Sequence, residues 1–138
     1  MAKMVLLASY VAIASNDLSD HCSKIELSVE VEEKDVTTFA SDGWTELLGG
    51  LGSGSLSLTF KQDYAASEID SIMWPLFLTR TPQTFEVRAD NGSVSTSNPK
   101  YTGSVLIKEW KPLTGSVGDV AEVEVSFPTS GAVTRSTS

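Results

Sequence analysis

The chain has 138 residues, a length that suits one domain with a core of its own. It carries 18 acidic and 10 basic residues, for a net charge of −8, and no cluster of lysine or arginine, which argues against a protein that grips nucleic acid through phosphate contacts. The single cysteine, Cys22, excludes an intrachain disulfide, and the apolar run 5–8 is shorter than a signal peptide or a membrane span requires.

The first third of the chain predicts an arm followed by strands. Residues 1–9 indicate a short, mostly apolar arm, and residues 10–14 a first strand. Residues 16–20 are typical of a turn, because Asn, Asp and Ser side chains bond their own backbone. The run 24–32 alternates apolar with mostly acidic residues, which predicts a strand with one buried and one solvated face.

Residues 35–54 show no regular period and combine five glycines with a tryptophan and three leucines. We expect a long irregular loop here, because disorder is disfavoured by this apolar content and long loops in compact domains are usually functional. Its apolar side chains are expected to be buried on a neighbouring subunit. The alternative is that the loop folds back as a lid on its own core.

The middle of the chain predicts a strand and then a helix. Residues 55–62 alternate again, and residues 65–78 place apolar side chains at helical spacing on a face that we expect to join the core. Ser67 and Asp70 resemble a capping box at the start of this helix. Pro75 is expected to kink or end it.

Three more strands are expected at 83–89, 100–110 and 120–127, with a tight turn at Asn91-Gly92 and a sheet end at Pro128. Several strands with one helix predict a mainly β fold, a β-sandwich or small barrel with one flanking α-helix. The expected layout is an N-terminal arm 1–9, a sandwich domain 10–128 with a long assembly loop at 36–54, and a C-terminal tail 129–138.

Residues able to carry chemistry are sparse. The glycine-rich run 49–54 lacks the spacing of a nucleotide-binding loop and is interpreted as a hinge. His21 and Cys22 are adjacent, so on a strand they would point to opposite faces and could not share a metal. Asp17, Asp20 and His21 could form at most a weak cation site, and an aspartate-rich turn is the better interpretation. We therefore predict no catalytic site, no metal and no cofactor.

Residues 98–134 resemble the major tail tube proteins of long, non-contractile-tailed (siphovirus) bacteriophages, especially those of actinobacterial hosts. The residues that carry the resemblance are Asn98-Pro99, Tyr101-Thr102-Gly103, Glu109-Trp110, Pro112-Leu113, Gly115-Ser116-Val117-Gly118-Asp119 and Ser130-Gly131-Ala132-Val133-Thr134. The resemblance implies a β-sandwich with one flanking helix, six copies of which form a ring. Stacked rings would make a hollow tube that conducts the genome during ejection.

The resemblance also implies that the loop 36–51 reaches into the adjacent ring and that the arms 1–9 and 129–138 reinforce the stack. The candidate inter-ring residues are Val36, Phe39, Trp44, Leu47, Leu48 and Leu51. The candidate contacts of the terminal arms are Met4, Val5, Leu6 and Val133.

An acidic chain suits a conduit for DNA, because a phosphate backbone should not adhere to its wall. Candidate wall residues lie on the polar faces of predicted strands, and an ordinary outer surface is the alternative interpretation of those faces. These candidates are Glu26, Glu30, Glu32, Glu122 and Glu124. A tube would also pair the exposed strand edges of each subunit with those of the next.

We therefore predict a non-enzymatic structural subunit of a viral tail tube, located in the virion tail and assembled in the bacterial host cytoplasm. Its expected partner is itself, with tape measure, tail terminator and tail tip proteins implied by the resemblance. DNA would pass without specific binding, and no membrane is involved. The alternatives are a single-ring tail terminator, a related secretion-tube protein, and an immunoglobulin-like binding module on a virion or cell surface.

Overall fold

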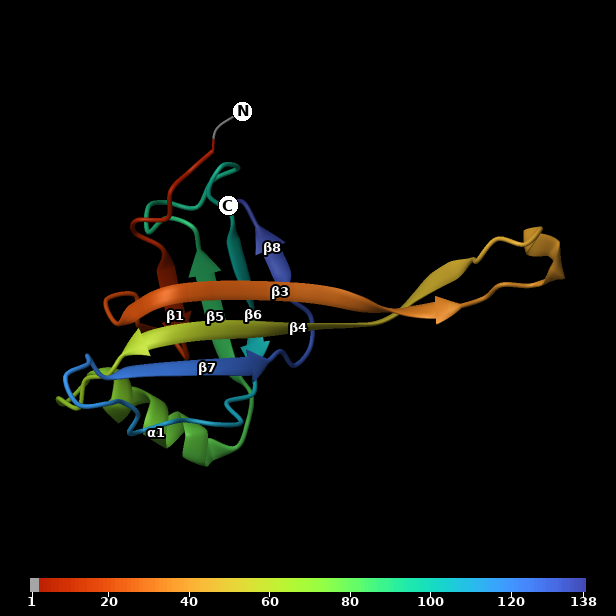
Figure 1. The fold of residues 1–138 in the computed structure, drawn as a ribbon. Coiled ribbons are helices and arrows are strands. Elements are labelled where there is room, and N and C mark those ends of the chain that lie inside the picture. Colours follow the sequence, from red (N-terminus) through yellow and green to blue (C-terminus); the bar gives the residue numbers. More distant parts are fainter. Residues whose placement is uncertain (1–2) are drawn as a thin grey trace.

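A computed structural model describes residues 3–138, which form two antiparallel sheets, one helix and a long projecting hairpin (Figure 1). The first sheet has the order β2-β1-β5-β6-β8 and the second the order β3-β4-β7. Within residues 3–138 the sheets remain open and do not close into a barrel, so the predicted sandwich with one flanking helix is confirmed in its open form. The elements are β1 (Tyr10–Ile13), β2 (Asn16–Asp17), β3 (Cys22–Asp35), the 3-10 turn η1 (Phe39–Ser41), β4 (Leu47–Lys61), α1 (Ile69–Thr79), β5 (Gln83–Arg88), β6 (Lys100–Val105), β7 (Glu122–Pro128) and β8 (Thr134–Ser136).

The core lies between the two sheets and follows from strict alternation along the strands. In β4, Leu56, Leu58 and Phe60 are buried, as predicted, and their neighbours in β7 are also buried. The first sheet contributes Phe85 and Val87 from β5 to the same cluster. Because burying one such side chain contributes about 1.5–3 kcal/mol, this shared cluster is the main source of stability.

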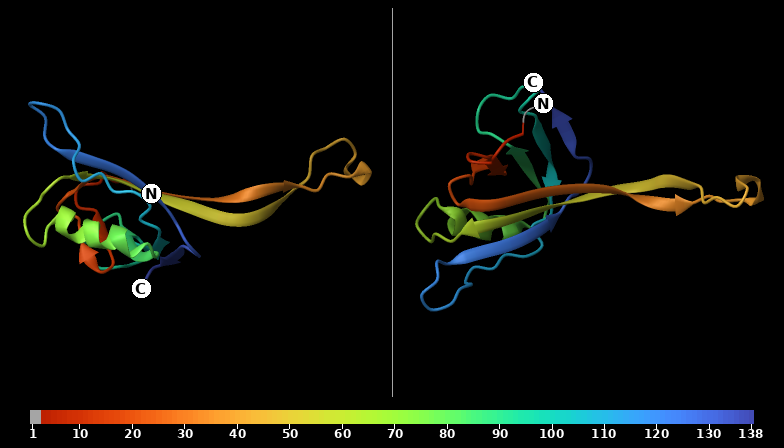
Figure 2. Two further views of the ribbon diagram at one scale, coloured as in Figure 1. Left: turned by 90° about the horizontal axis from the view of Figure 1, so that it is seen from below. Right: turned by 45° about the horizontal axis from the view of Figure 1, so that its top comes forward.

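Helix α1 covers one end of the sandwich (Figures 1 and 2). Ile69 and Met73 are fully buried, which confirms that the apolar stripe faces the core. Trp110 Nε1 donates to Asp70 Oδ1 at 3.0 Å, and the Trp110 ring packs against Phe60 with centroids 6.3 Å apart. The predicted capping box is therefore wrong, since Asp70 bonds a tryptophan and the N-cap is Glu68 with no side-chain cap.

The sequence predicts that Pro75 kinks or ends the helix; the second of these alternatives is wrong, because the helix continues through Pro75 to Thr79. Pro75 cannot donate to the carbonyl of Ser71, but both residues are exposed, and water can reach that carbonyl. Tertiary packing of the opposite face outweighs the lost hydrogen bond.

Several boundaries differ from the predictions. The expected turn at 16–20 contains β2, because the chain reverses earlier, at Ala14 and Ser15, which both have positive φ. The expected strand 100–110 leaves the sheet after Val105, although Ile107 and Trp110 stay buried. The C-terminal tail contains β8, which pairs with β6.

The largest difference concerns residues 35–54. The predicted irregular loop is confirmed only for residues 36–46 and is wrong for residues 47–54, which belong to β4. β3 and β4 pair from Lys24↔Thr59 out to Asp35↔Leu47, whereas β7 pairs only with Ser55–Lys61 of β4. The two long strands therefore run beyond the sandwich as a two-stranded ribbon (Figure 2). The glycines of β4 do not interrupt it, and Gly54 is required there because a Cβ would lie 2.7 Å from the Ser28 carbonyl oxygen.

No helix among residues 3–138 is long and apolar enough to cross a membrane.

Candidate assembly surfaces

We call residues 29–54 the hairpin arm and residues 36–46 its tip. The tip is closed by local hydrogen bonds: Val36 N donates to Glu46 O at 2.9 Å, and Glu46 N donates to Thr37 Oγ1 at 2.8 Å. Thr38 caps η1, with its side chain accepting from Ala40 N. The tip is therefore a defined structure at the end of the ribbon, and the ribbon holds it away from the sandwich formed by the other described residues (Figure 1).

An aspartate at the base of the tip is held in its charged form. The Thr37 hydroxyl and backbone amide beside Asp35 hold the pKa of this carboxyl below its ordinary value of 3.8. Thr37 N donates to Asp35 Oδ1 at 2.8 Å. Since the folded chain favours the ionised form, the stabilisation is complete above pH 3.8 and is lost as the pH falls through the lower, folded pKa.

The hairpin arm displays apolar side chains to solvent. Trp44 is 77% exposed and Phe39 is fully exposed, so the alternative of a lid over the subunit's own core is wrong. Exposed apolar area gathered on one projecting segment is typical of an interaction surface. The exposed large apolar residues of the arm are Val29, Val31, Val36, Phe39, Trp44, Leu47, Leu48 and Leu51.

We call residues 29–35 and 47–54, which lie between the sandwich and the tip, the stalk of the arm. The stalk limits one prediction about β3. Ile25 and Leu27 are partly buried against the core, but Val29 and Val31 are exposed because the strand has left the sandwich at that point. The expectation of one buried face along 24–32 therefore holds only for its first half. The apolar face of β3 continues onto the arm without a covering layer.

The second sheet has a polar outer face, opposite to its core-facing side. Hydroxyl side chains dominate its centre, and Ser57 Oγ donates to Ser126 Oγ at 3.1 Å. Near one end, Lys61 Nζ and Glu122 Oε1 form an exposed ion pair at 2.5 Å. The outer sheet face within the sandwich comprises Lys24, Glu26, Ser28, Ser55, Ser57, Thr59, Lys61, Glu122, Glu124 and Ser126.

This arrangement separates the predicted wall residues into two groups. Glu26, Glu122 and Glu124 share the outer sheet face, which has a formal charge of −1 once Lys24 and Lys61 are included. Glu30 and Glu32 lie on the stalk, beyond the last pairing of β7 with β4. A register shift between Val31 and Glu33 also breaks the alternation next to Glu32.

The N-terminal segment is attached at its base and exposed beyond it. Of the predicted arm 1–9, residues 1–2 lie outside the described residues. Ala8 O accepts from Asn91 N at 2.8 Å, and Ser9 Oγ donates to Ala89 O at 3.1 Å. Met4, Val5 and Leu6 project without burial, so their role as contacts stays a prediction.

The C-terminal segment differs from a free arm. Val133 is half-buried against the subunit's own core, and Thr134–Ser136 add β8 to the edge of the first sheet. Its small, polar composition contained no alternation that would have revealed this strand. Val133 is therefore not a free arm contact in the isolated subunit.

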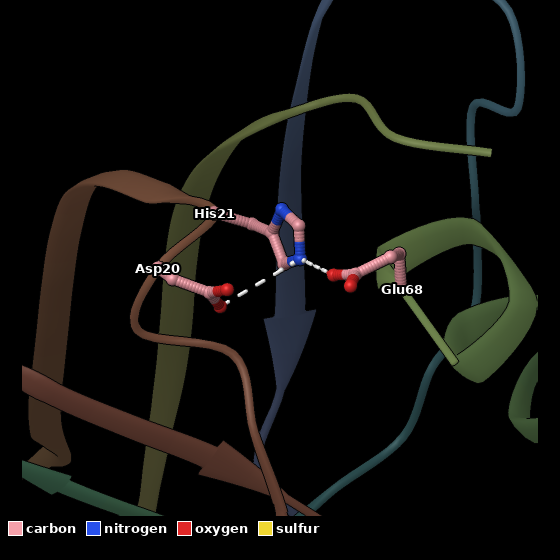
Figure 3. Close-up of side chains that lie close together, drawn as sticks. All are labelled: Asp20, His21 and Glu68. Atoms are coloured by element: carbon pink, nitrogen blue, oxygen red, sulfur yellow. Dashed lines mark hydrogen bonds and ion pairs between the residues drawn. The ribbon is translucent and has the colours of Figure 1, made fainter. Parts of the chain in front are cut away.

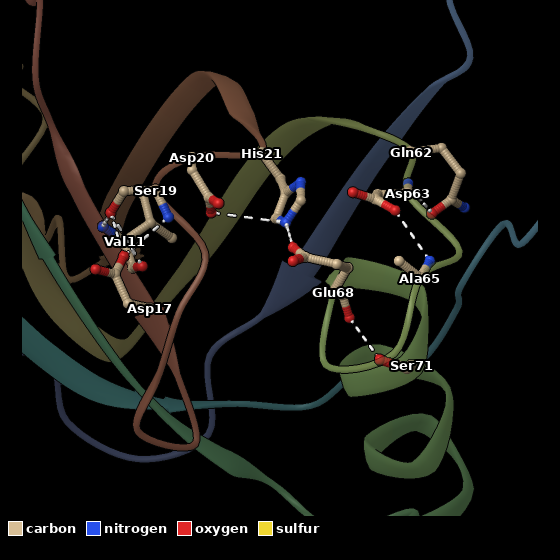
Figure 4. Close-up of polar contacts among 10 residues, drawn as sticks. All are labelled: Val11, Asp17, Ser19, Asp20, His21, Gln62, Asp63, Ala65, Glu68 and Ser71. Atoms are coloured by element: carbon tan, nitrogen blue, oxygen red, sulfur yellow. Dashed lines mark hydrogen bonds and ion pairs between the residues drawn. The ribbon is translucent and has the colours of Figure 1, made fainter.

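Three titratable side chains lie close together where the turn before β3 meets α1 (Figure 3). His21 Nε2 is 2.5 Å from Glu68 Oε2 and 3.6 Å from Asp20 Oδ1. Asp17 does not join them, because its carboxylate accepts from Ser19 N and Ser19 Oγ (Figure 4). The sequence analysis did not include Glu68 in this cluster, because Glu68 is distant from His21 in the chain and lies at the start of the helix.

This cluster connects two elements through one short contact. His21 is almost buried, whereas Asp20 is largely exposed. Cys22 does not belong to the cluster, because its thiol donates to Lys24 O at 3.1 Å. Burial raises the pKa of this thiol. The geometry suits a structural link between the β2–β3 turn and α1.

We expect His21→Ala to lower the free energy of unfolding by about 1–3 kcal/mol, the usual range for a hydrogen bond with a charged partner. Urea denaturation of the purified chain measures it. The control Asp20→Asn should change stability by no more than about 0.5 kcal/mol, because that carboxylate is exposed and 3.6 Å away. Equal effects of the two substitutions would contradict the assigned link.

These features define a class of protein. An open β-sandwich with a projecting apolar hairpin, an uncovered N-terminal segment and bare sheet edges is a structural subunit built to contact other protein copies. The comparison with known families makes this specific. The chain belongs to the phage tail tube protein family, whose family model matches residues 22–135. It is therefore a structural subunit of a viral tail tube and a component of the virion tail.

Two solved structures share the fold. One is described as the tail of an empty GTA particle with C6 symmetry; it is 24% identical, has a TM-score of 0.67, and the match covers 83% of this chain and 81% of that one. The other comes from the virion of a native gene transfer agent (GTA) particle, also 24% identical, with a TM-score of 0.68 and coverage of 84% and 85%. No curated protein matches the chain.

Proposed function

We propose that six copies of this chain close into a ring and that the rings stack into a tube, with the hairpin arm of each subunit reaching into the next ring. One observation carries the proposal: a tail tube family member holds eight large apolar side chains in solvent on a hairpin clear of its own core. Burial on another copy removes this apolar area from water. The C6 symmetry of the similar GTA tail supports six subunits in a ring.

Lateral contacts within the ring use the sheet edges. β3 and β7 are the two edges of the second sheet, so their outward backbone groups have no partner strand among residues 3–138. Edge-to-edge pairing with adjacent copies satisfies these groups, and head-to-tail contacts of this kind close into rings. The exposed N-terminal segment, with Met4, Val5 and Leu6, adds contacts to the stack.

The outer sheet face lines the channel in this proposal. This face carries hydroxyl groups, three carboxylates and two lysines, and one of the lysines, Lys61, is paired with Glu122. A phosphate backbone therefore gains few charge contacts on it. DNA therefore passes without specific binding. Glu30 and Glu32, on the stalk, are placed near the joint between rings.

The chain acts by assembly and not by catalysis. The cluster of His21, Asp20 and Glu68 supplies a structural link, and its histidine is already engaged by a carboxylate. We further propose that assembly takes place in the cytoplasm of a bacterial host, with tape measure, terminator and tip proteins as partners. An actinobacterial host stays a prediction from the resemblance.

Electron microscopy of the purified chain across a concentration series tests the proposal. We expect rings with a central hole and six-fold symmetry at low concentration, and stacked tubes at higher concentration. Rings that never stack would favour a terminator that caps the tube. A monomer at every concentration would overturn the proposal.

A further inference from the structure

A groove at the open end of the sandwich lies between β3 and strands β5, β6 and β8 of the first sheet. The cavity has a volume of about 650 Å³, within the range of about 300–1,000 Å³ that buries small ligands. Its walls come from both sheets and both terminal segments. Apolar lining residues include Leu6, Ile25, Leu27, Val29, Tyr101 and Val133.

Two arginines line the groove. Among its described lining residues the charged ones are Arg88 and Arg135. Arg88 is already engaged within its own subunit: its Nε forms an ion pair with Glu86 Oε2 at 3.3 Å, its Nη1 donates to Gly92 O at 2.9 Å, and its guanidinium lies 4.1 Å from the Tyr10 ring centroid. Arg135 is exposed on β8 and forms no ion pair within residues 3–138. The groove therefore offers an apolar floor with one available cation at its edge.

The tip of the hairpin arm has the complementary character. It presents Phe39 and Trp44, and residues 35–46 include Asp35, Asp42 and Glu46 but no lysine or arginine. The tip lies at the far end of the ribbon, away from its own sandwich, so it cannot reach its own groove (Figures 1 and 2). The tip is apolar and acidic, and the groove is apolar and basic, so the two surfaces are complementary. Within one chain they are too far apart to meet, so they can only meet between two copies.

We propose that the groove at the open end of the sandwich is the receptor for the arm tip of a second copy of this chain. The aromatic side chains of the tip enter the apolar cavity, and Glu46 pairs with Arg135 at its edge. This inference rests on the proposed stacking of rings and adds the surface on which the arm docks. It also assigns a role to Val133 and β8, which shape the groove from within the receiving subunit.

A charge exchange tests the pairing in the full-length chain. We expect Arg135→Glu and Glu46→Arg each to raise the concentration needed for tube formation at least tenfold at low ionic strength. The double variant should return it to within about threefold of the parent. Both side chains are exposed, and circular dichroism should show that all three variants fold. Sedimentation of assembled tubes provides the measurement.

The matched control combines Glu46→Arg with Lys108→Glu, an exposed lysine outside the groove lining, and should give no rescue. If the parent forms tubes but the double reversal stays as defective as the single ones, the arm docks elsewhere and this inference falls while the tube function stands. If the parent forms no rings or tubes, the proposed function falls and takes the inference with it.

Discussion

Replacing Trp44 with alanine and Leu48 with serine should abolish tube growth while leaving the subunit folded. Both side chains are exposed in the isolated chain, so their loss removes little from the folded core. In a stacked tube they would be central anchors, each worth about 2 kcal/mol or more. Losing both should raise the concentration required for stacking about a thousandfold. Electron microscopy and sedimentation record tube growth, and urea denaturation records folding.

The matched control for this variant is Trp74→Ala with Leu78→Ser, which removes the same two side-chain types from the exposed side of α1. We expect that control to assemble normally. Tubes that grow from the Trp44/Leu48 variant at the parent's concentration would show that the hairpin arm does not join the rings. Rings that remain intact but do not stack would support the proposal that the hairpin arm joins successive rings while the sheet edges close each ring.

Reversing two charges on the outer sheet face should slow DNA release without preventing assembly. Glu26→Lys with Glu124→Lys changes the formal charge of this face from −1 to +3 in each subunit. A hexameric ring would then present a strongly cationic collar, and each added phosphate contact strengthens binding through counterion release. We expect release of DNA from assembled particles to slow by at least tenfold at low salt and to recover as salt rises.

The control for the wall is Glu109→Lys with Asp119→Lys, which makes the same change in net charge on exposed residues of the segment between β6 and β7. Release should be unaffected by that pair. Unchanged release from the Glu26/Glu124 variant, with tubes intact, would place the outer sheet face away from the channel. Glu30→Lys with Glu32→Lys tests the stalk separately, and we expect a smaller effect on release.

Much of the sandwich could be predicted from alternation alone. Leu56, Leu58 and Phe60 mark β4, and Phe85 with Val87 mark β5, because period-2 burial leaves a direct trace in composition. The helix was also visible from its apolar stripe. The ends of the helix could not be predicted in the same way. Asp70 accepts a hydrogen bond from Trp110, forty residues away, and does not cap the helix, and Pro75 lies on the solvent-exposed side.

In the hairpin arm, the residue types predict which side chains are exposed, but they do not predict the conformation of the backbone. The sequence correctly predicts that Trp44 and Leu48 lie outside their own core, whereas the glycines among residues 49–54 wrongly predict a loop. Those residues are extended because β3 pairs with them, and a long-range partner is not encoded in a local window. β8 was missed for the same reason, since Thr134–Ser136 are ordered by β6 and carry no period.

The stalk has a mechanical consequence for the assembled filament. It consists of two strands only, with four glycines on one strand and a register shift on the other. A ribbon of this kind bends and twists more readily than a sandwich with a packed interior. If such ribbons are what couples one ring to the next, curvature is taken up at the joints while each ring keeps its shape, and the tail can flex without narrowing its bore.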